Sequence, residues 1–123
     1  MKRGIMMDMQ EIMAQKTFVV VGDTLNENKY AYLIKKELLE KGYTVYAVGK
    51  ELQSLNEIEE EIDVIDLCIN PIKGLKLLKE CKKSFKMMII QPGAANEELL
   101  AYLNEQNLPY VEGCVLVGLR AYV

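Results

Sequence analysis

The segment TFVVVGDTLNENKYA, from Thr17 to Ala31, decides the fold of this chain. It opens with a β-branched run that ends at Gly22, continues through a polar loop, and enters a helical pattern near Asn28. Runs of valine favour strands, and a strand followed by a loop and a helix is the repeating unit of α/β proteins. At the carboxyl end of such a strand, unpaired backbone N–H groups and the helix dipole favour bound phosphate.

The glycine pattern of this loop is incomplete. No second glycine stands between Gly22 and Gly42, so neither G-x-G-x-x-G nor G-x-x-x-x-G-K-[ST] is present. The segment alone therefore fits a ligand loop and an ordinary βα turn equally well. In a ligand loop, we expect the Gly22 turn to approach the ligand too closely for a side chain.

Four further apolar runs follow the first strand, Phe18–Val21. They span Thr44–Val48, Asp63–Ile69, Met87–Ile90 and Pro109 to about Cys114. Continuous apolar runs are typical of strands that are covered on both faces. The pattern predicts an α/β fold with a doubly wound parallel five-stranded sheet in the order 3-2-1-4-5, and a switch point between strands 1 and 4. A single domain accounts for residues 1–123.

Helical spacing predicts the elements between the strands. Helices are expected from Tyr30 to Leu39, around Leu75 and Leu78, from Glu97 to Gln106, and over residues 1–15, where Ile5, Met9, Ile12 and Met13 share one face. The acidic segment Leu52–Ile62 is expected to be a solvated connection with at most a brief helix. The apolar tail Val115–Val123 either completes the core or pairs with a second copy of the chain.

The composition excludes several function classes. The 15 basic and 18 acidic residues are spread along the chain and give a net charge of −3, which disfavours a nucleic-acid partner. No apolar run approaches the roughly 20 residues that span a bilayer, so no membrane association is expected. The three widely spaced cysteines fit reduced thiols in a cytoplasm.

The chain contains no histidine and no C-x-x-C motif. It therefore lacks an imidazole general base, and no metal-ligand cluster is visible in the sequence. We expect no metal and no catalytic activity of the protein's own.

Turn-forming and polar residues follow each of the five strands. They are Gly22-Asp23-Thr24, Gly49-Lys50, Asn70-Pro71, Gln91-Pro92-Gly93 and Gly113-Cys114. Because the carboxyl ends of parallel strands meet at one edge of a sheet, these residues are expected to face one crevice. Each also has a purely structural alternative, as a tight turn, a helix cap or a first helical turn.

The end of the second strand discriminates among nucleotide ligands. An NAD site usually has an acid there to accept from the ribose hydroxyls. Here Val48 is followed by Gly49 and Lys50, and the acid comes only at Glu51. A lysine suits a phosphorylated ribose better than a bare diol. The alternative is that Lys50 is an ordinary surface lysine.

Taken together, these segments resemble a known family. The resemblance rests on these segments: VVVGD at 19–23, NKY at 28–30, EKGYTVYAV at 40–48, DVIDLCINP at 63–71, IIQPGAANEEL at 89–99, and Cys114. In this order and spacing they are similar to the small stand-alone coenzyme A-binding proteins, relatives of the N-terminal domain of the succinyl-CoA synthetase α subunit. The resemblance covers about residues 10–118.

The resemblance implies a Rossmann-like fold that binds coenzyme A or an acyl-CoA, without synthetase activity, because the synthetases use a phosphorylated histidine. It also implies the position of each ligand group. The pyrophosphate would lie at Gly22, Asp23, Thr24, Asn28, Lys29 and Tyr30, the adenosine and its 3′-phosphate at Val48 and Lys50, the adenine at Asn70 and Pro71, and the pantetheine at Gln91, Gly93 and Asn96. Cys114 matches the cysteine of the family after the fifth strand.

Two residues need a specific arrangement if this resemblance holds. Asp23 stands where the family often has serine, so its carboxylate is expected to point away from the pyrophosphate or to cap the next helix. Cys114 is either a reactive thiol beside the ligand or a small buried hydrophobic residue.

Two other classes of function remain open from the sequence. One is an NAD(P)-binding enzyme or redox sensor. The other is a protein-interaction module with a vestigial nucleotide pocket, for which a homodimer through the C-terminal tail is the simplest partner.

Overall fold

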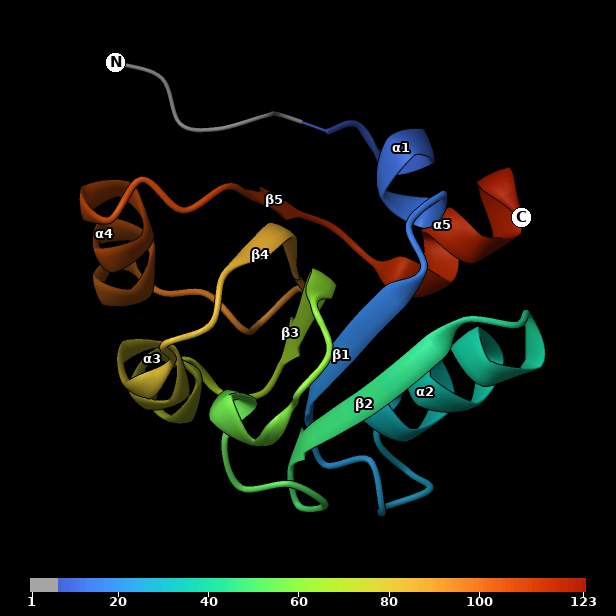
Figure 1. Ribbon diagram of the computed structural model, residues 1–123, viewed down its shortest axis with the longest axis horizontal. Coiled ribbons are helices and arrows are strands. Elements are labelled where there is room, and N and C mark those ends of the chain that lie inside the picture. The colour runs from blue at the N-terminus through green and yellow to red at the C-terminus, as the bar shows by residue number, and fades with distance from the viewer. Residues whose placement is uncertain (1–6) are drawn as a thin grey trace.

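A computed structural model describes residues 7–123 as a parallel five-stranded sheet between two layers of helices (Figure 1). The strands are β1 (Thr17–Gly22), β2 (Thr44–Gly49), β3 (Ile62–Cys68), β4 (Phe85–Ile90) and β5 (Tyr110–Glu112). The helices are α1 (Met9–Met13), α2 (Tyr30–Glu40), the 3₁₀ turn η1 (Leu55–Glu57), α3 (Pro71–Glu80), α4 (Glu97–Glu105) and α5 (Val115–Tyr122). The predicted α/β doubly wound parallel sheet is confirmed.

The strand order is β2-β1-β3-β4-β5, which corrects the predicted order 3-2-1-4-5. The prediction placed β3 outside β2, whereas β3 pairs with β1 and β2 forms an edge. The reason is burial: β2 begins with an exposed Thr44, whereas Val64 to Leu67 of β3 are completely buried. The switch point, where the order of strand addition reverses, therefore lies between β1 and β3, and ligands bind at this position in such sheets.

Alternate side chains of each strand pack into two separate layers. Val19, Ile65 and Ile90 face the layer of α3, α4 and η1, whereas Phe18 and Val20 face the layer of α1, α2 and α5. Figure 1 shows these two helical layers on opposite sides of the sheet. Because both faces are covered, the strands appear in the sequence as continuous apolar runs.

The connection between β2 and β3 is more than a solvated loop. A brief helix forms at η1, as expected, but Leu55 is completely buried and Ile58 is 2 % exposed. Ser54 and Glu57 form a capping box at this turn, which fixes both apolar side chains against the sheet. This segment covers a face of the sheet, because no long helix lies between β2 and β3.

The two terminal helices pack against each other. A side chain on Gly118 of α5 would meet Met9 and Met13 of α1 within 3.0 Å, so the glycine allows the helices to approach closely. Of the predicted N-terminal helix, Ile5 lies outside the described residues. Val115 and Leu119 of α5 are buried in the core, which agrees with the core-packing alternative for the tail. None of the helices in residues 7–123 is long and apolar enough to cross a membrane.

Candidate functional site

A cleft of about 570 Å³ opens at the carboxyl ends of the strands. The register of the sheet aligns Gly22 with Gly49 of β2 and with Cys68 of β3, so three strand ends meet at its floor. The lining residues are Gly22, Asp23, Lys29, Tyr30, Ala31, Gly49, Lys50, Cys68, Ile69, Asn70, Lys73, Gln91, Pro92, Gly93 and Ala94. The volume is in the range of small-molecule sites, about 300–1,000 Å³.

The cleft brings together most of the residues that the sequence singled out. Gly22, Asp23, Lys29, Tyr30, Lys50, Asn70, Gln91 and Gly93 line it. The remaining predicted residues, which are Thr24, Asn28, Val48, Pro71, Asn96 and Cys114, are not among the lining residues. Val48 is buried in the core, and Asn96 accepts a hydrogen bond from the Leu99 amide (2.8 Å) to cap α4.

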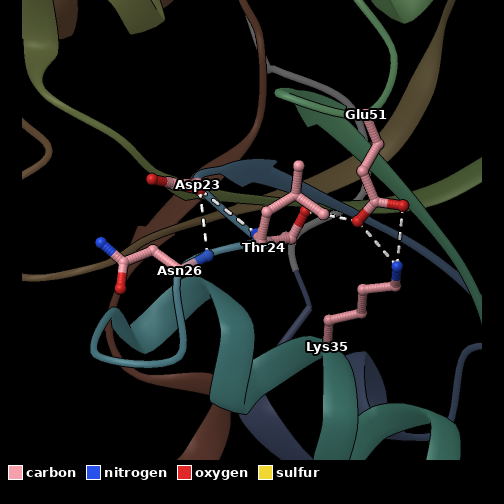
Figure 2. Close-up of polar contacts among 6 residues, drawn as sticks. Asp23, Thr24, Asn26, Lys35 and Glu51 are labelled. Carbon is pink, nitrogen blue, oxygen red and sulfur yellow. Dashed lines mark hydrogen bonds and ion pairs between the residues drawn. The ribbon is translucent and has the colours of Figure 1, made fainter.

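The loop after β1 is held by its own side chains. One carboxylate oxygen of Asp23 accepts from the amides of Leu25 and Asn26, both at 3.2 Å. The Asn26 side chain in turn accepts from the Asn28 amide at 2.9 Å. Asp23 therefore shapes the loop (Figure 2), rather than capping the helix that follows. Part of its negative charge is neutralised by these amides.

The N-terminus of α2 faces the cleft without a cap. Its first residues, Tyr30 and Ala31, line the cleft, and no side chain of residues 7–123 accepts a hydrogen bond from its first turn. By contrast, Asn70 caps α3 by accepting from the Lys73 amide at 2.9 Å, and Asn96 caps α4. The first N–H groups of α2 and the positive end of its dipole are therefore free for a bound anion.

Three lysines line the cleft, and each comes from a different segment of the chain. Lys29 precedes α2, Lys50 follows β2, and Lys73 lies in the first turn of α3. Among the lining residues in the described part of the chain, Asp23 is the only acid. The cleft therefore favours an anionic ligand. Lys73 was not predicted from the sequence, where its only signal is its position three residues after the Asn70 cap.

Thr24 is turned away from the cleft toward Glu51. The Thr24 hydroxyl donates to a Glu51 carboxylate oxygen at 2.6 Å, and Thr24 is 3 % exposed. The Lys35 ammonium of α2 contacts both oxygens of Glu51, at 2.7 and 2.9 Å (Figure 2). Lys35, and then Thr24, lower the pKa of the Glu51 carboxyl below its ordinary value. This network ties together the loops that follow β1 and β2.

The glycine at the end of β1 faces protein rather than open space. A side chain on Gly22 would place its Cβ 2.3 Å from the carbonyl oxygen of Cys68. Gly49 is also restricted, because its φ is +129° and a Cβ there would lie 2.9 Å from the Gly22 carbonyl oxygen. Gly22 was expected to be needed for the approach of a ligand, but packing of the strands already requires a glycine there.

Two thiols and an amide lie at the β3 and β4 side of the cleft. Gln91 accepts from the Val115 amide at 3.0 Å and donates to the Cys114 sulfur at 3.6 Å, so it caps α5. Cys68 lines the cleft and was not among the predicted site residues. Burial, followed by the nearby Asp66 and Cys114, raises the pKa of the Cys68 thiol to about 12.

Asp66 is an unusual residue for the centre of a sheet. It is completely buried, and neither of its carboxyl oxygens has a hydrogen-bond partner within the described residues. Its neighbours across the sheet are Val20 of β1 and Ile89 of β4. Burial raises its pKa to about 8, so the carboxyl is mostly protonated at pH 7. Within residues 7–123, no group of three acidic, cysteine or histidine side chains is placed to hold a metal.

The sequence pattern of the CoA binding domain family matches residues 16–120. The chain belongs to the CoA binding domain family. This membership confirms the resemblance carried by the strand-end motifs. The membership supports binding of coenzyme A in general.

Several solved structures share this fold. A conserved hypothetical protein from Pyrococcus furiosus is 30 % identical, with a TM-score of 0.74, and the match covers 84 % of this chain and 98 % of that one. A hypothetical protein from Pyrococcus horikoshii is 24 % identical, with a TM-score of 0.78 and coverage of 90 % and 86 %. A protein from Thermus thermophilus is 20 % identical, with a TM-score of 0.74 and coverage of 95 % and 100 %.

The last two similarities concern the fold alone. No curated protein matches the chain.

Proposed function

We propose that this protein binds coenzyme A or an acyl-CoA in the cleft and has no catalytic activity of its own. The observation that carries the proposal is the uncapped N-terminus of α2, which opens into a cleft lined by three lysines. Coenzyme A combines a pyrophosphate with a separate ribose phosphate, and these features of the cleft complement both groups.

The pyrophosphate is assigned to the start of α2. A helix N-terminus binds phosphate through its free N–H groups and its dipole, and Lys29 adds a full positive charge at the same place. Asp23 is compatible with this position, because it accepts two amides of its own loop. The carboxylate thus has partners that reduce its repulsion of the ligand.

The 3′-phosphate is assigned to Lys50 at the end of β2. Lys50 is exposed and lines the cleft, whereas the neighbouring acid, Glu51, is paired with Lys35 and Thr24. A phosphate therefore meets an ammonium at this position, and a bare ribose diol has no free carboxylate to bind. This distribution of charge favours coenzyme A over NAD.

The absence of catalysis is inferred from the state of the ionisable groups in the cleft. The Cys68 thiol has a pKa raised to about 12, so it is a poor nucleophile at neutral pH. The Asp23 carboxylate is held by two amides. Three free cysteines also fit a reducing compartment, which supports a cytoplasmic location.

Calorimetric titration with coenzyme A tests the proposal, together with native mass spectrometry of the purified protein. The variant Lys29→Glu places a negative charge at the proposed pyrophosphate position and should weaken binding at least about tenfold, or on the order of 1.4 kcal/mol. Lys36→Glu makes the same charge change at an exposed position of α2 that does not line the cleft, and should change Kd much less. Failure of coenzyme A to bind, or tighter binding of NAD, would refute the proposal.

A further inference from the structure

Lys35 connects the helix that begins at the cleft to the acid that follows β2. Its ammonium lies 2.7 and 2.9 Å from the two carboxylate oxygens of Glu51, and the Thr24 hydroxyl donates to the same carboxylate at 2.6 Å (Figure 2). Glu51 therefore has two partners, of which only Lys35 carries a charge.

Glu51 stands close to where dinucleotide-binding sheets have the acid that accepts the ribose hydroxyls. The positive φ of Gly49, +129°, turns the chain at the end of β2. After this turn Lys50 lines the cleft, whereas Glu51 is not among the lining residues. Two adjacent residues of opposite charge are thus separated: Lys50 faces the cleft, whereas Glu51 is bound on the α2 side by Lys35 and Thr24.

We propose that Lys35 is a specificity-determining residue, which acts by positioning and neutralising Glu51. With Glu51 held by Lys35, the end of β2 presents only the positive charge of Lys50 to the ligand. The site then selects a phosphorylated ribose over an unphosphorylated one. This inference rests on the proposed function, since it assigns the source of ligand preference within the same cleft.

The energetics of the pair favour a role in selectivity rather than in folding. The side chains of Lys35 and Glu51 are 27 % and 31 % exposed, and partly exposed ion pairs stabilise folded proteins little. Removing Lys35 would leave Glu51 bonded to an uncharged hydroxyl, with its full charge beside the position of the ribose phosphate. The Glu51 carboxylate and the ribose phosphate are both negative and would repel each other, whereas an unphosphorylated ribose would gain a hydrogen-bond acceptor.

The variant Lys35→Met tests this role by titration with coenzyme A and with dephospho-CoA at low salt. The wild-type protein should bind coenzyme A more tightly. In the variant, coenzyme A should lose about fivefold in affinity, which corresponds to about 1 kcal/mol, while dephospho-CoA binds as well as before or better. Lys36→Met removes the same charge from the next residue of the helix and should preserve the wild-type preference.

A second substitution distinguishes the electrostatic role from a structural one. The double variant Lys35→Met/Glu51→Gln removes the unmasked charge, and should restore the preference for coenzyme A. Lys35→Arg keeps the ion pair and should behave as the wild type. The difference between the two ligands should also shrink in high salt, because exposed charges are screened.

Several results would overturn the inference. An unchanged preference in Lys35→Met, or no recovery in the double variant, would show that Lys35 does not set selectivity through Glu51. Equal affinity of the wild type for both ligands would refute the selectivity while leaving coenzyme A binding intact. Binding of neither ligand to the wild type would refute the proposed function as well.

Discussion

Asp66 lies two residues before Cys68 on the same face of β3, and its buried carboxyl contributes to the raised pKa of that thiol. Asp66 itself has no hydrogen-bond partner in the described part of the chain, so burial raises its own pKa to about 8. The carboxyl and the thiol therefore both keep their protons at pH 7, and both titrate at alkaline pH.

The first prediction concerns the pH dependence of stability. In the unfolded chain the Asp66 carboxyl has its ordinary pKa of 3.8, and in the folded protein a pKa of about 8. Between these values the folded state binds more protons, so the free energy of unfolding should fall as pH rises, approaching about 1.4 kcal/mol per pH unit from this group. Asp66→Asn should remove this dependence and raise stability at pH 8. Urea denaturation between pH 5 and 9 measures both effects.

Asp63 on the same strand is the matched control. Burial alone would raise its pKa, but hydrogen bonds from the Thr17 and Lys16 amides and the Lys86 ammonium lower it overall. Asp63 therefore contributes stability above pH 4 that is lost on acidification, and Asp63→Asn should destabilise the protein at pH 7. If both variants shift stability in the same direction, the assignment of Asp66 as a protonated buried carboxyl is wrong.

The second prediction concerns the three thiols. Cys68 lines the cleft but has a strongly raised pKa, so its alkylation at pH 8 should be slow, and saturating coenzyme A should slow it further. Cys81 lies away from the cleft, at the end of α3, and its rate should not respond to ligand. Peptide mass spectrometry after a timed reaction with iodoacetamide resolves the three sites. Protection of Cys114 alone would place the ligand thiol nearer to α5 than the cleft indicates.

The sequence predicted the elements of the fold better than their arrangement. Continuous apolar runs identified all five strands, because a strand buried on both faces is apolar along its whole length. The order of β2 and β3 was wrong, since pairing is decided by which strand tolerates an exposed edge. Thr44 at the start of β2 is the local sign of that edge, but the apolar residues that follow hide it.

The residues of the candidate site that lie at or just after the strand ends were predictable from the sequence. Gly22 is the last residue of β1, Lys50 directly follows β2, and Gly93 lies in the loop after β4. All three line the cleft, as topology requires. The orientation of Thr24 was not predictable, because it depends on the position of Glu51, 27 residues further along the chain. Sequence spacing conveys nothing about such a pairing until the strand order is known.

The third prediction concerns the hydroxyl of Thr24. Thr24→Val keeps the shape of this buried side chain but removes the donor to Glu51, and should destabilise the protein by about 1–2 kcal/mol. Thr44→Val at the exposed start of β2 is the control, and should change the free energy of unfolding little. Thermal denaturation of the three proteins measures the difference. A neutral Thr24→Val would mean that Lys35 alone positions Glu51.

The last prediction concerns the glycine at the end of β1. In Gly22→Ala the new methyl group would lie 2.3 Å from the Cys68 carbonyl oxygen and 3.0 Å from the Cβ of Ala31. The central strands β1 and β3 cannot separate without breaking their ladder, so we expect a loss of at least about 3 kcal/mol, or failure to fold.

Gly113→Ala is the corresponding control, because among the described residues a Cβ there would meet only the Met9 sulfur, at 4.0 Å. Circular dichroism and denaturant titration should therefore show a folded Gly113→Ala protein of nearly wild-type stability beside a strongly destabilised Gly22→Ala. A stable Gly22→Ala that binds no coenzyme A would instead mean that this glycine is needed for the approach of the ligand, as the sequence first indicated.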